Sequence, residues 1–152
     1  MSESLSLVPY SREFLNLSFR WLTDPEIKRL TDTPDITREG QEAWFDSLPF
    51  KDDYMVWGVQ IGENPAGACG LKHISGDKAE YFGYLGEKSL WGRKYGGQMM
   101  AQVEEKARSM DIRTLCLRVR KDNERAVRLY RRMGYSTSEE TPDFLLMNKI
   151  LV

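Results

Sequence analysis

The sequence has few of the side chains that commonly bind metals or form disulfides. It contains one histidine, His73, and two cysteines, Cys69 and Cys116. Their spacing matches no metal-binding pattern, so we expect no bound metal. Both cysteines lie in apolar, strand-like stretches, which favours two small buried residues over a disulfide or a nucleophile.

The chain also lacks any apolar run long enough to cross a membrane, and it has no excess of positive charge. Its formal net charge is −1, so we expect no general nucleic-acid surface. Residues 1–6 lack the charged and apolar segments of a signal peptide, which favours a cytoplasmic protein. Since no repeat or Pro/Gly linker divides the sequence, we expect residues 1–152 to form a single domain.

Positive charge is nevertheless concentrated in the C-terminal part of the chain. Most of these side chains are expected to lie on a solvated surface, but a few could bind a phosphorylated ligand. The concentrated residues are Arg113, Arg118, Arg120, Lys121, Arg125, Arg128, Arg131 and Arg132.

The spacing of hydrophobic residues predicts different secondary structures in the two halves of the chain. The first half is expected to contain one strand and three helix starts, followed by three strands in an antiparallel meander. The expected strands are residues 5–9, 55–61, 66–74 and 79–85, and the expected helix-capping residues are Ser11, Asp24 and Thr37.

The second half is expected to alternate between helices and strands. The expected elements are a helix over 96–110, a strand over 114–119, a helix from about Asn123 to Gly134, and a strand over 144–151. In the first helix, Met99, Val103, Ala107 and Met110 should face the core, with Glu104, Glu105 and Arg108 opposite. This order predicts an α+β fold, with a central, mixed and largely antiparallel sheet flanked by helices.

Two local patterns carry most of the chemical information. The turn Trp91–Gln98 is rich in glycine and leads into a helix, whose unpaired N–H groups can bind a pyrophosphate. Such a turn can also serve only to start a helix. In the second pattern, Asn123 and Tyr130 stand two helical turns apart and can face one cleft. Asn123 could instead be a helix cap, and Tyr130 a core ring.

Together these patterns resemble the GNAT superfamily of N-acetyltransferases, which use acetyl-CoA. The resemblance is strongest over residues 79–135, where Asp122–Tyr135 is similar to the family's second signature. The segments Trp21–Glu26 and Trp44–Phe45 resemble one branch, which includes ribosomal-protein-type N-terminal acetyltransferases and enzymes that acetylate nucleotide-linked amino sugars. The resemblance implies a GNAT fold whose central sheet is splayed at an acetyl-CoA cleft.

The resemblance also implies roles for individual residues. Tyr130, with an ordinary pKa of about 10, would donate a proton to the CoA thiolate, whose conjugate acid has a pKa of about 8.5. Glu80 is the favoured general base, with His73 or a water chain as alternatives. Backbone groups of Tyr84 and Leu85 would hold the pantetheine arm. The other expected cofactor-binding residues are Gly92, Arg93, Lys94, Tyr95, Gly96, Gly97 and Asn123.

The phosphate loop departs from the family's usual Gln/Arg-x-x-Gly-x-Gly/Ala. If Gly96 takes the last position, Lys94 stands where glycine is expected. If Arg93 stands first, Gln98 takes the small-residue position. We favour the first register, because Gly92–Gly96 then matches the branch's Gly-Lys-Gly-Tyr-Gly. Lys94 is then expected to adopt a backbone conformation that costs a non-glycine residue about 1 kcal/mol or more.

We therefore expect an N-acetyltransferase that moves an acetyl group from acetyl-CoA to a primary amine of a small acceptor. A nucleotide-linked amino sugar is one candidate, since Trp21, Trp44 and Phe45 could stack on a sugar or base, although the pattern is more typical of ordinary core aromatics. The alternatives are a protein N-terminal acetyltransferase and a non-catalytic acyl-CoA-binding module. We expect a monomer or a homodimer.

Overall fold

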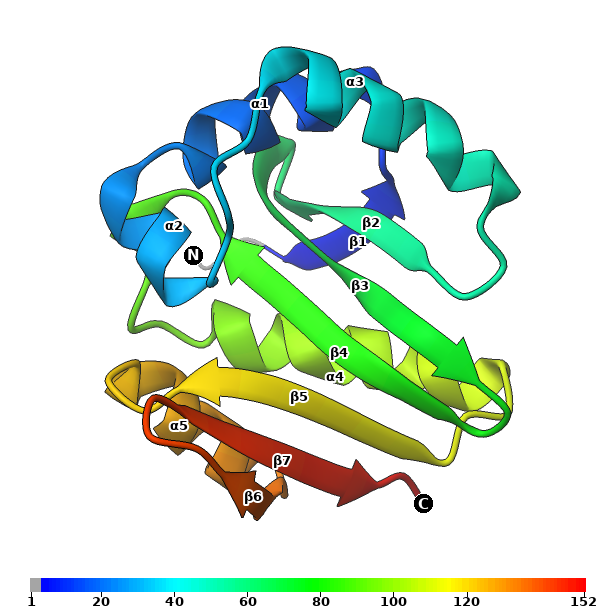
Figure 1. The fold of residues 1–152 in the computed structure, drawn as a ribbon. Coiled ribbons are helices and arrows are strands. Elements are labelled where there is room, and N and C mark those ends of the chain that lie inside the picture. Colours follow the sequence, from blue (N-terminus) through cyan, green and yellow to red (C-terminus); the bar gives the residue numbers. More distant parts are fainter. Residues whose placement is uncertain (1–3) are drawn as a thin grey trace.

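The computed structural model describes residues 4–152 as one seven-stranded sheet with helices on both faces (Figure 1). The first three residues, part of the segment that favoured a cytoplasmic protein, lie outside the described range. The strands are β1 (Leu5–Pro9), β2 (Met55–Ile61), β3 (Asn64–Ser75), β4 (Lys78–Leu85), β5 (Thr114–Arg120), β6 (Ser136–Glu140) and β7 (Phe144–Ile150). The helices are α1 (Arg12–Leu22), α2 (Pro25–Leu30), α3 (Arg38–Ser47), α4 (Tyr95–Ser109) and α5 (Glu124–Arg132), with short 3₁₀ turns η1 (Leu48–Phe50) and η2 (Lys88–Leu90).

The strand order across the sheet is β1-β2-β3-β4-β5-β7-β6, and every neighbouring pair is antiparallel except β4 with β5. The prediction of a mixed, largely antiparallel sheet is therefore confirmed. The parallel β4–β5 pairing is short and ends where Glu80 lies beside Cys116. Beyond that point each strand pairs only with its other neighbour, so the sheet splits, as the resemblance implied.

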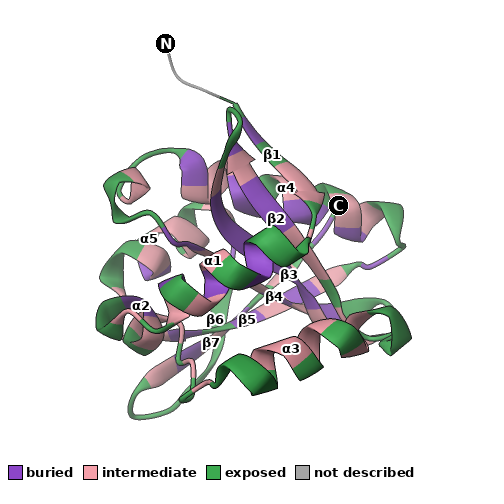
Figure 2. Cartoon of the chain, turned by 90° about the horizontal axis from the view of Figure 1, so that it is seen from above, coloured by how far each residue is buried: buried purple, intermediate pink, exposed green. Residues whose placement is uncertain are grey.

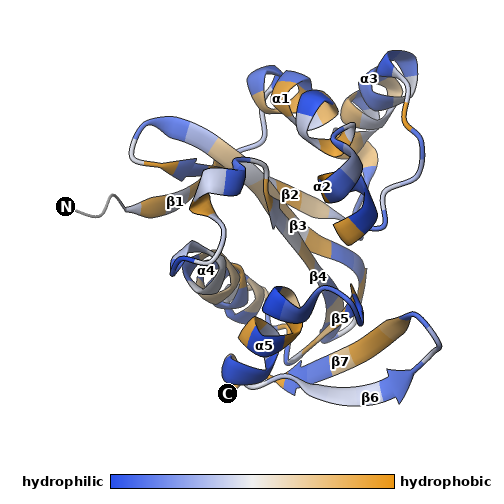
Figure 3. Cartoon of the chain, turned by 90° about the vertical axis from the view of Figure 1, so that its left-hand side faces the viewer, coloured by the Kyte–Doolittle hydropathy of each residue, from blue (hydrophilic) through white to orange (hydrophobic). Residues whose placement is uncertain are grey.

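Helices cover the two faces of the sheet unequally. Figure 3 shows α4 and α5 on one side and α1, α2 and α3 on the other. The main core lies between α4 and the strands, where Met100 and Val103 of α4 pack with Val59, Leu71 and Leu115. Figure 2 shows this burial along the central strands, in contrast to the exposed outer face of α3. The core thus fixes α4 against the strands that border the split.

Capping side chains set the starts of several helices. Asp24 accepts hydrogen bonds from the backbone N–H groups of Glu26 and Ile27 at 3.0 and 3.2 Å, and Thr37 accepts one from Gly40 at 3.0 Å. These two predicted caps are confirmed. The prediction for Ser11 was wrong in detail, because it occupies the N-cap position of α1 without a side-chain capping bond.

The structure differs from the sequence predictions at four points. Strand β6 was not predicted, because its five residues are all exposed and show no apolar alternation. Glu104 was placed on the polar face of α4, yet it is only 3% exposed. Met110 was placed on the core face but is 36% exposed. On α5, Val127 is the buried residue, whereas the four predicted core residues, Ala126, Leu129, Tyr130 and Met133, are only partly buried. Three of them, Ala126, Tyr130 and Met133, nevertheless pack against the core.

Both cysteines are free thiols; Cys69 is buried and Cys116 partly buried. Across residues 4–152, no helix is long and apolar enough to pass through a membrane. The same residues contain no group of three or more His, Cys, Asp or Glu side chains placed to hold a metal ion.

Candidate active site

A cleft of about 900 Å³ opens where β4 and β5 diverge. Side chains from both faces of the sheet line it, including Tyr54 from the α1–α3 side and Tyr130 from the α4–α5 side. A continuous sheet would keep these two faces apart, whereas the split lets them meet in one cavity. A donor molecule bound on one side can therefore reach an acceptor bound on the other.

Most of the sequence-predicted site residues line this cleft. The lining set includes Glu80, Tyr84, Leu85, Gly92, Arg93, Gly96, Asn123 and Tyr130. Lys94, Tyr95 and Gly97 do not belong to it. Tyr95, the first residue of α4, is 5% exposed and its side chain packs in the core, so only its backbone is available to a ligand at the start of the helix. Asn123 is the N-cap of α5, where its side chain accepts a hydrogen bond from the N–H of Ala126 at 3.4 Å.

The glycine-rich turn has a backbone suited to a close ligand. Gly92 has a φ of +75°, and a Cβ built at this position would meet no atom within 4 Å. The expected strain at Lys94 is wrong: its φ of −71° is an ordinary right-handed value. Lys94 is the N-cap of α4 and makes no side-chain capping hydrogen bond. The first turn of α4 thus offers backbone N–H groups and a positive dipole to an anion, which fits a pyrophosphate.

Trp91 joins the turn to the end of β4, a role that the sequence did not reveal. Its indole Nε1 donates a hydrogen bond to the carbonyl oxygen of Leu85 at 2.8 Å. The guanidinium of Arg125 lies 5.2 Å from the centre of the Trp91 ring, within range of a cation–π contact. Trp91 therefore fixes the relative positions of β4, the glycine-rich turn and α5.

Tyr130 lies between two other tyrosines. Its ring centre is 6.4 Å from that of Tyr81 and 6.2 Å from that of Tyr135, with interplanar angles of 76° and 58°. Burial raises the pKa of Tyr130 to about 12, above the ordinary value used in the sequence argument. The phenol is therefore protonated at neutral pH and available as a hydrogen-bond donor, although it is a weaker acid than a free tyrosine.

Glu80 lies at the apex of the split and has two partners. Its Oε1 is 3.1 Å from Nδ1 of His73, and its Oε2 is 3.5 Å from Nζ of Lys72. The Glu80 side chain is 22% exposed and lines the cleft, whereas the His73 side chain is 72% exposed. A carboxylate in this position can accept a proton inside the cleft and remain connected to solvent through the imidazole.

Aromatic rings form a wall on the α1–α3 side of the cleft. Tyr10 contacts Trp44 edge-on with a centroid distance of 5.6 Å, Trp44 contacts Tyr54 at 6.0 Å, and Tyr54 stacks on Phe82 at 5.4 Å. Of the three aromatics singled out in the sequence, Trp44 lines the cleft, whereas Trp21 is buried and Phe45 is not a lining residue. Phe82 could have been found from its place on β4, since strand alternation puts it on the same face as Glu80.

The cleft carries more positive than negative charge. Asp32 and Glu80 are the carboxylates among the described lining residues, and both are paired with a base. Asp32 accepts a hydrogen bond from Arg118 at 2.5 Å, and the Arg118 guanidinium lies 3.4 Å from the centre of the Phe144 ring. The basic lining residues are Lys72, Arg93, Arg118, Arg120, Arg125, Arg128 and Arg132.

Residues 16–135 match the profile of the acetyltransferase (GNAT) family, so the chain belongs to this family. No curated protein matches the chain. Among solved structures, a domain from Methanocaldococcus jannaschii is 17% identical, with a TM-score of 0.88 over 98% of this chain and 99% of that one.

Two named enzymes share the fold at similarly low identity. Spermidine N-acetyltransferase from Vibrio cholerae, in complex with CoA and spermine, is 16% identical, with a TM-score of 0.88 over 97% of this chain and 95% of that one. The Campylobacter jejuni N-acetyltransferase PseH, in complex with acetyl coenzyme A, is 18% identical, with a TM-score of 0.75 over 98% and 100%.

Proposed function

We propose that the protein transfers the acetyl group of acetyl-CoA to the primary amine of a small acceptor. The observation that carries this proposal is the split between β4 and β5, where the first turn of α4, the Glu80 carboxylate and the Tyr130 phenol face one cavity. Two GNAT enzymes of the same fold, in complex with CoA or acetyl-CoA, support the choice of donor.

Donor binding follows from the backbone around the split. The N–H groups of the first α4 turn bind the pyrophosphate, with help from the cationic side chain of Arg93. Beyond Glu80, the edge of β4 that faces the gap has no strand partner, so its backbone groups near Tyr84 and Leu85 can pair with the amides of the pantetheine arm. The thioester is thereby held at the apex of the split.

The chemical step needs one proton acceptor and one proton donor. The neutral amine attacks the thioester carbonyl, a C–N bond forms, and the nitrogen loses a proton to Glu80 directly or through water. The C–S bond then breaks, and Tyr130 donates a hydrogen bond and finally its proton to the departing thiolate. The products are the N-acetylated amine and CoA. Because the Tyr130 pKa is about 12, the phenol acts mainly by stabilising the developing thiolate, and transfer of its proton comes late.

The lining of the cleft favours an acceptor that carries a ring and an anionic group. The aromatic wall can stack on a sugar or base, and Arg118 can bind a phosphate or carboxylate. A polyamine such as spermine would instead favour an excess of carboxylates, whereas the described lining of the cleft contains two carboxylates, Asp32 and Glu80, and seven basic side chains. A nucleotide-linked amino sugar meets these requirements. A protein N-terminus remains the alternative acceptor.

An acetyl-CoA consumption assay with a panel of amines tests the proposal. The panel contains nucleotide-linked amino sugars, amino acids, polyamines and peptides with free N-termini, and the readouts are CoA thiol release and the mass of the acetylated product. We expect turnover with an amino-sugar nucleotide. Turnover restricted to peptides would favour the N-terminal acetyltransferase, and acetyl-CoA binding without any turnover would favour the non-catalytic module.

A further inference from the structure

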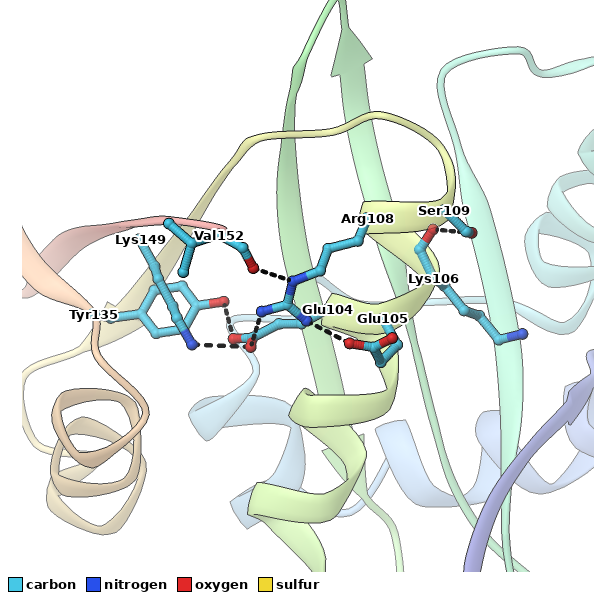
Figure 4. Close-up of polar contacts among 8 residues, drawn as sticks. All are labelled: Glu104, Glu105, Lys106, Arg108, Ser109, Tyr135, Lys149 and Val152. Carbon is cyan, nitrogen blue, oxygen red and sulfur yellow. Dashed lines mark hydrogen bonds and ion pairs between the residues drawn. The ribbon is translucent and has the colours of Figure 1, made fainter.

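A buried carboxylate lies behind the catalytic cleft, on the helix whose first turn faces the donor. Glu104 of α4 is 3% exposed, and Figure 4 shows its polar contacts with Tyr135, Lys149 and Arg108. Its Oε2 accepts a hydrogen bond from the Tyr135 hydroxyl at 3.0 Å, and its Oε1 lies 2.9 Å from Nζ of Lys149. Arg108 approaches Oε1 to 3.9 Å and donates a hydrogen bond to the carbonyl oxygen of Val152 at 3.1 Å. The carboxylate is therefore fully paired.

Such a buried ion pair is weak evidence for stability by itself. Removing two charges from water costs free energy that their attraction only partly restores, and apolar side chains of similar size often replace such pairs without loss. What the cluster does supply is a fixed position for each partner. Tyr135 is the partner that connects Glu104 to the catalytic cleft.

Tyr135 is joined to Tyr130 through both backbone and side chain. Gly134, with a φ of +98°, ends α5 in the left-handed conformation that favours glycine. This turn lets the Tyr135 N–H donate a hydrogen bond to the carbonyl oxygen of Tyr130 at 2.9 Å. The two rings also pack with their centres 6.2 Å apart. Tyr135 therefore contacts Tyr130 both at its backbone carbonyl and at its ring.

We propose that Glu104 and Tyr135 are positioning residues, which hold the Tyr130 phenol at a fixed place relative to the donor-binding turn of α4. The proposal rests on the proposed function in so far as Tyr130 is the proton donor of acetyl transfer. Glu104 lies on α4, the helix whose first turn is the proposed pyrophosphate site. Contacts from Glu104 to the Tyr135 hydroxyl, and from Tyr135 to Tyr130, thus connect the proton donor Tyr130 to α4, the helix that carries the donor-binding turn.

The Tyr135→Phe variant tests this link, because it removes the hydroxyl and keeps the ring against Tyr130. A displacement of about 1 Å can cost up to about 100-fold in rate, so we expect a kcat lowered about 10-fold with the KM for acetyl-CoA unchanged. In a Tyr130→Phe background the same change should lower kcat no further, since its effect passes through the phenol. An equal fold loss in both backgrounds, or no loss in either, would overturn the proposal.

Neighbouring glutamates on α4 provide a matched pair of variants. Glu104→Gln weakens the contacts to Tyr135 and Lys149, so it should lower kcat, as Tyr135→Phe does. Glu105→Gln changes the next residue, whose side chain is 76% exposed and pairs with Arg108, and should leave kcat unchanged. Equal effects of the two substitutions would indicate a general change in α4 and would contradict a specific positioning role. Thermal unfolding of each variant checks that the fold is retained.

A readout that needs no turnover separates this proposal from the proposed function. In protein labelled with ¹³C at the tyrosine Cζ, the Tyr130 resonance is assigned by its loss in Tyr130→Phe. It should shift or broaden in Tyr135→Phe and Glu104→Gln, and remain unchanged in Glu105→Gln. A Tyr130 resonance that none of these substitutions affects would overturn the positioning role. Absence of acetyl transfer by the wild-type protein would overturn the proposed function alone.

Discussion

Nδ1 of His73 lies 3.1 Å from Oε1 of Glu80, so the two residues considered as alternative bases are direct neighbours. His73 adopts a left-handed backbone conformation, with φ of +52°, at an irregularity in the β3–β4 register. This bulge sets its side chain beside Glu80 and leaves it largely exposed. For the proposed acetyl transfer, the arrangement favours two unequal roles: Glu80 would accept the proton inside the cleft, and His73 would pass it to solvent.

Glu80→Gln and His73→Gln are therefore expected to differ in magnitude. Loss of a general base typically costs about 10²–10⁴-fold in rate, so Glu80→Gln should lower kcat by about 100-fold or more. His73→Gln should cost less than about 10-fold, since water can replace an exposed relay. Steady-state kinetics at saturating acetyl-CoA check this, with the exposed Glu63→Gln as a control. Equal losses in the two variants would assign the base role to the pair, and an active Glu80→Gln would remove it from Glu80.

Tyr130→Phe should separate catalysis from donor binding. The change removes only the hydroxyl, so we expect kcat to fall by about 100-fold or more. Calorimetric titration should give the same Kd for acetyl-CoA within about twofold, because the ring still fills its place between Tyr81 and Tyr135. Unchanged turnover would remove the phenol from the mechanism.

The dependence of kcat on pH provides a separate test of the phenol. Since burial raises the Tyr130 pKa to about 12, the hydroxyl stays protonated through the region near pH 10 where a free tyrosine ionises. Ionisation of this hydroxyl should therefore cause no loss of kcat between about pH 9 and 10.5, and kcat should decline only as the pH approaches 12. A wild-type decline with an apparent pKa near 10, absent from Tyr130→Phe, would contradict the buried environment.

Local sequence signals account for the parts of the fold and site that were predicted. Alternation in β2, β3 and β4, the caps at Asp24 and Thr37, and the seven-residue spacing of Asn123 and Tyr130 all lie within short segments. Each can be evaluated without knowing what packs against it.

The missed features depend on partners far away in the sequence. Glu104 appears as a surface acid until Tyr135 and Lys149, which are 31 and 45 residues away, are seen to satisfy it. The aromatic wall is likewise assembled from separate elements, with Tyr54 preceding β2 and Phe82 on β4. No periodicity within one segment encodes such contacts.

In the glycine-rich turn, Gly92 and not Lys94 has the left-handed backbone, which leads to a stability prediction. Gly92 requires a left-handed backbone, which costs a residue with a Cβ about 1–2 kcal/mol, so Gly92→Ala should lower the free energy of unfolding by that amount. Lys94 is right-handed, so Lys94→Gly should relieve no backbone strain and should not raise the free energy of unfolding. Urea unfolding of both variants measures these values. A stability gain in Lys94→Gly would restore the original expectation of a strained lysine.

Arg118 and Asp32 should influence acceptor affinity in opposite directions. A hydrogen bond to a charged group contributes about 1.5–3 kcal/mol, so Arg118→Gln should raise the KM for a nucleotide-linked amino sugar about 10-fold or more. Asp32→Asn removes the carboxylate that now pairs with Arg118 and should lower this KM. Asparagine tolerates the left-handed conformation of Asp32, whose φ is +53°, so the fold should be retained.

The KM for acetyl-CoA should stay constant in both variants, and Arg113→Gln, at an exposed position outside the cleft lining, serves as the charge-matched control. Opposite shifts in the acceptor KM would show that Arg118 binds an anionic group for which Asp32 competes. An increase in both variants would instead mean that the ion pair acts as a unit, holding the loop after α2 against β5, and the case for an anionic acceptor would lose its main support. A decrease with Arg118→Gln would point to a cationic acceptor that the arginine repels.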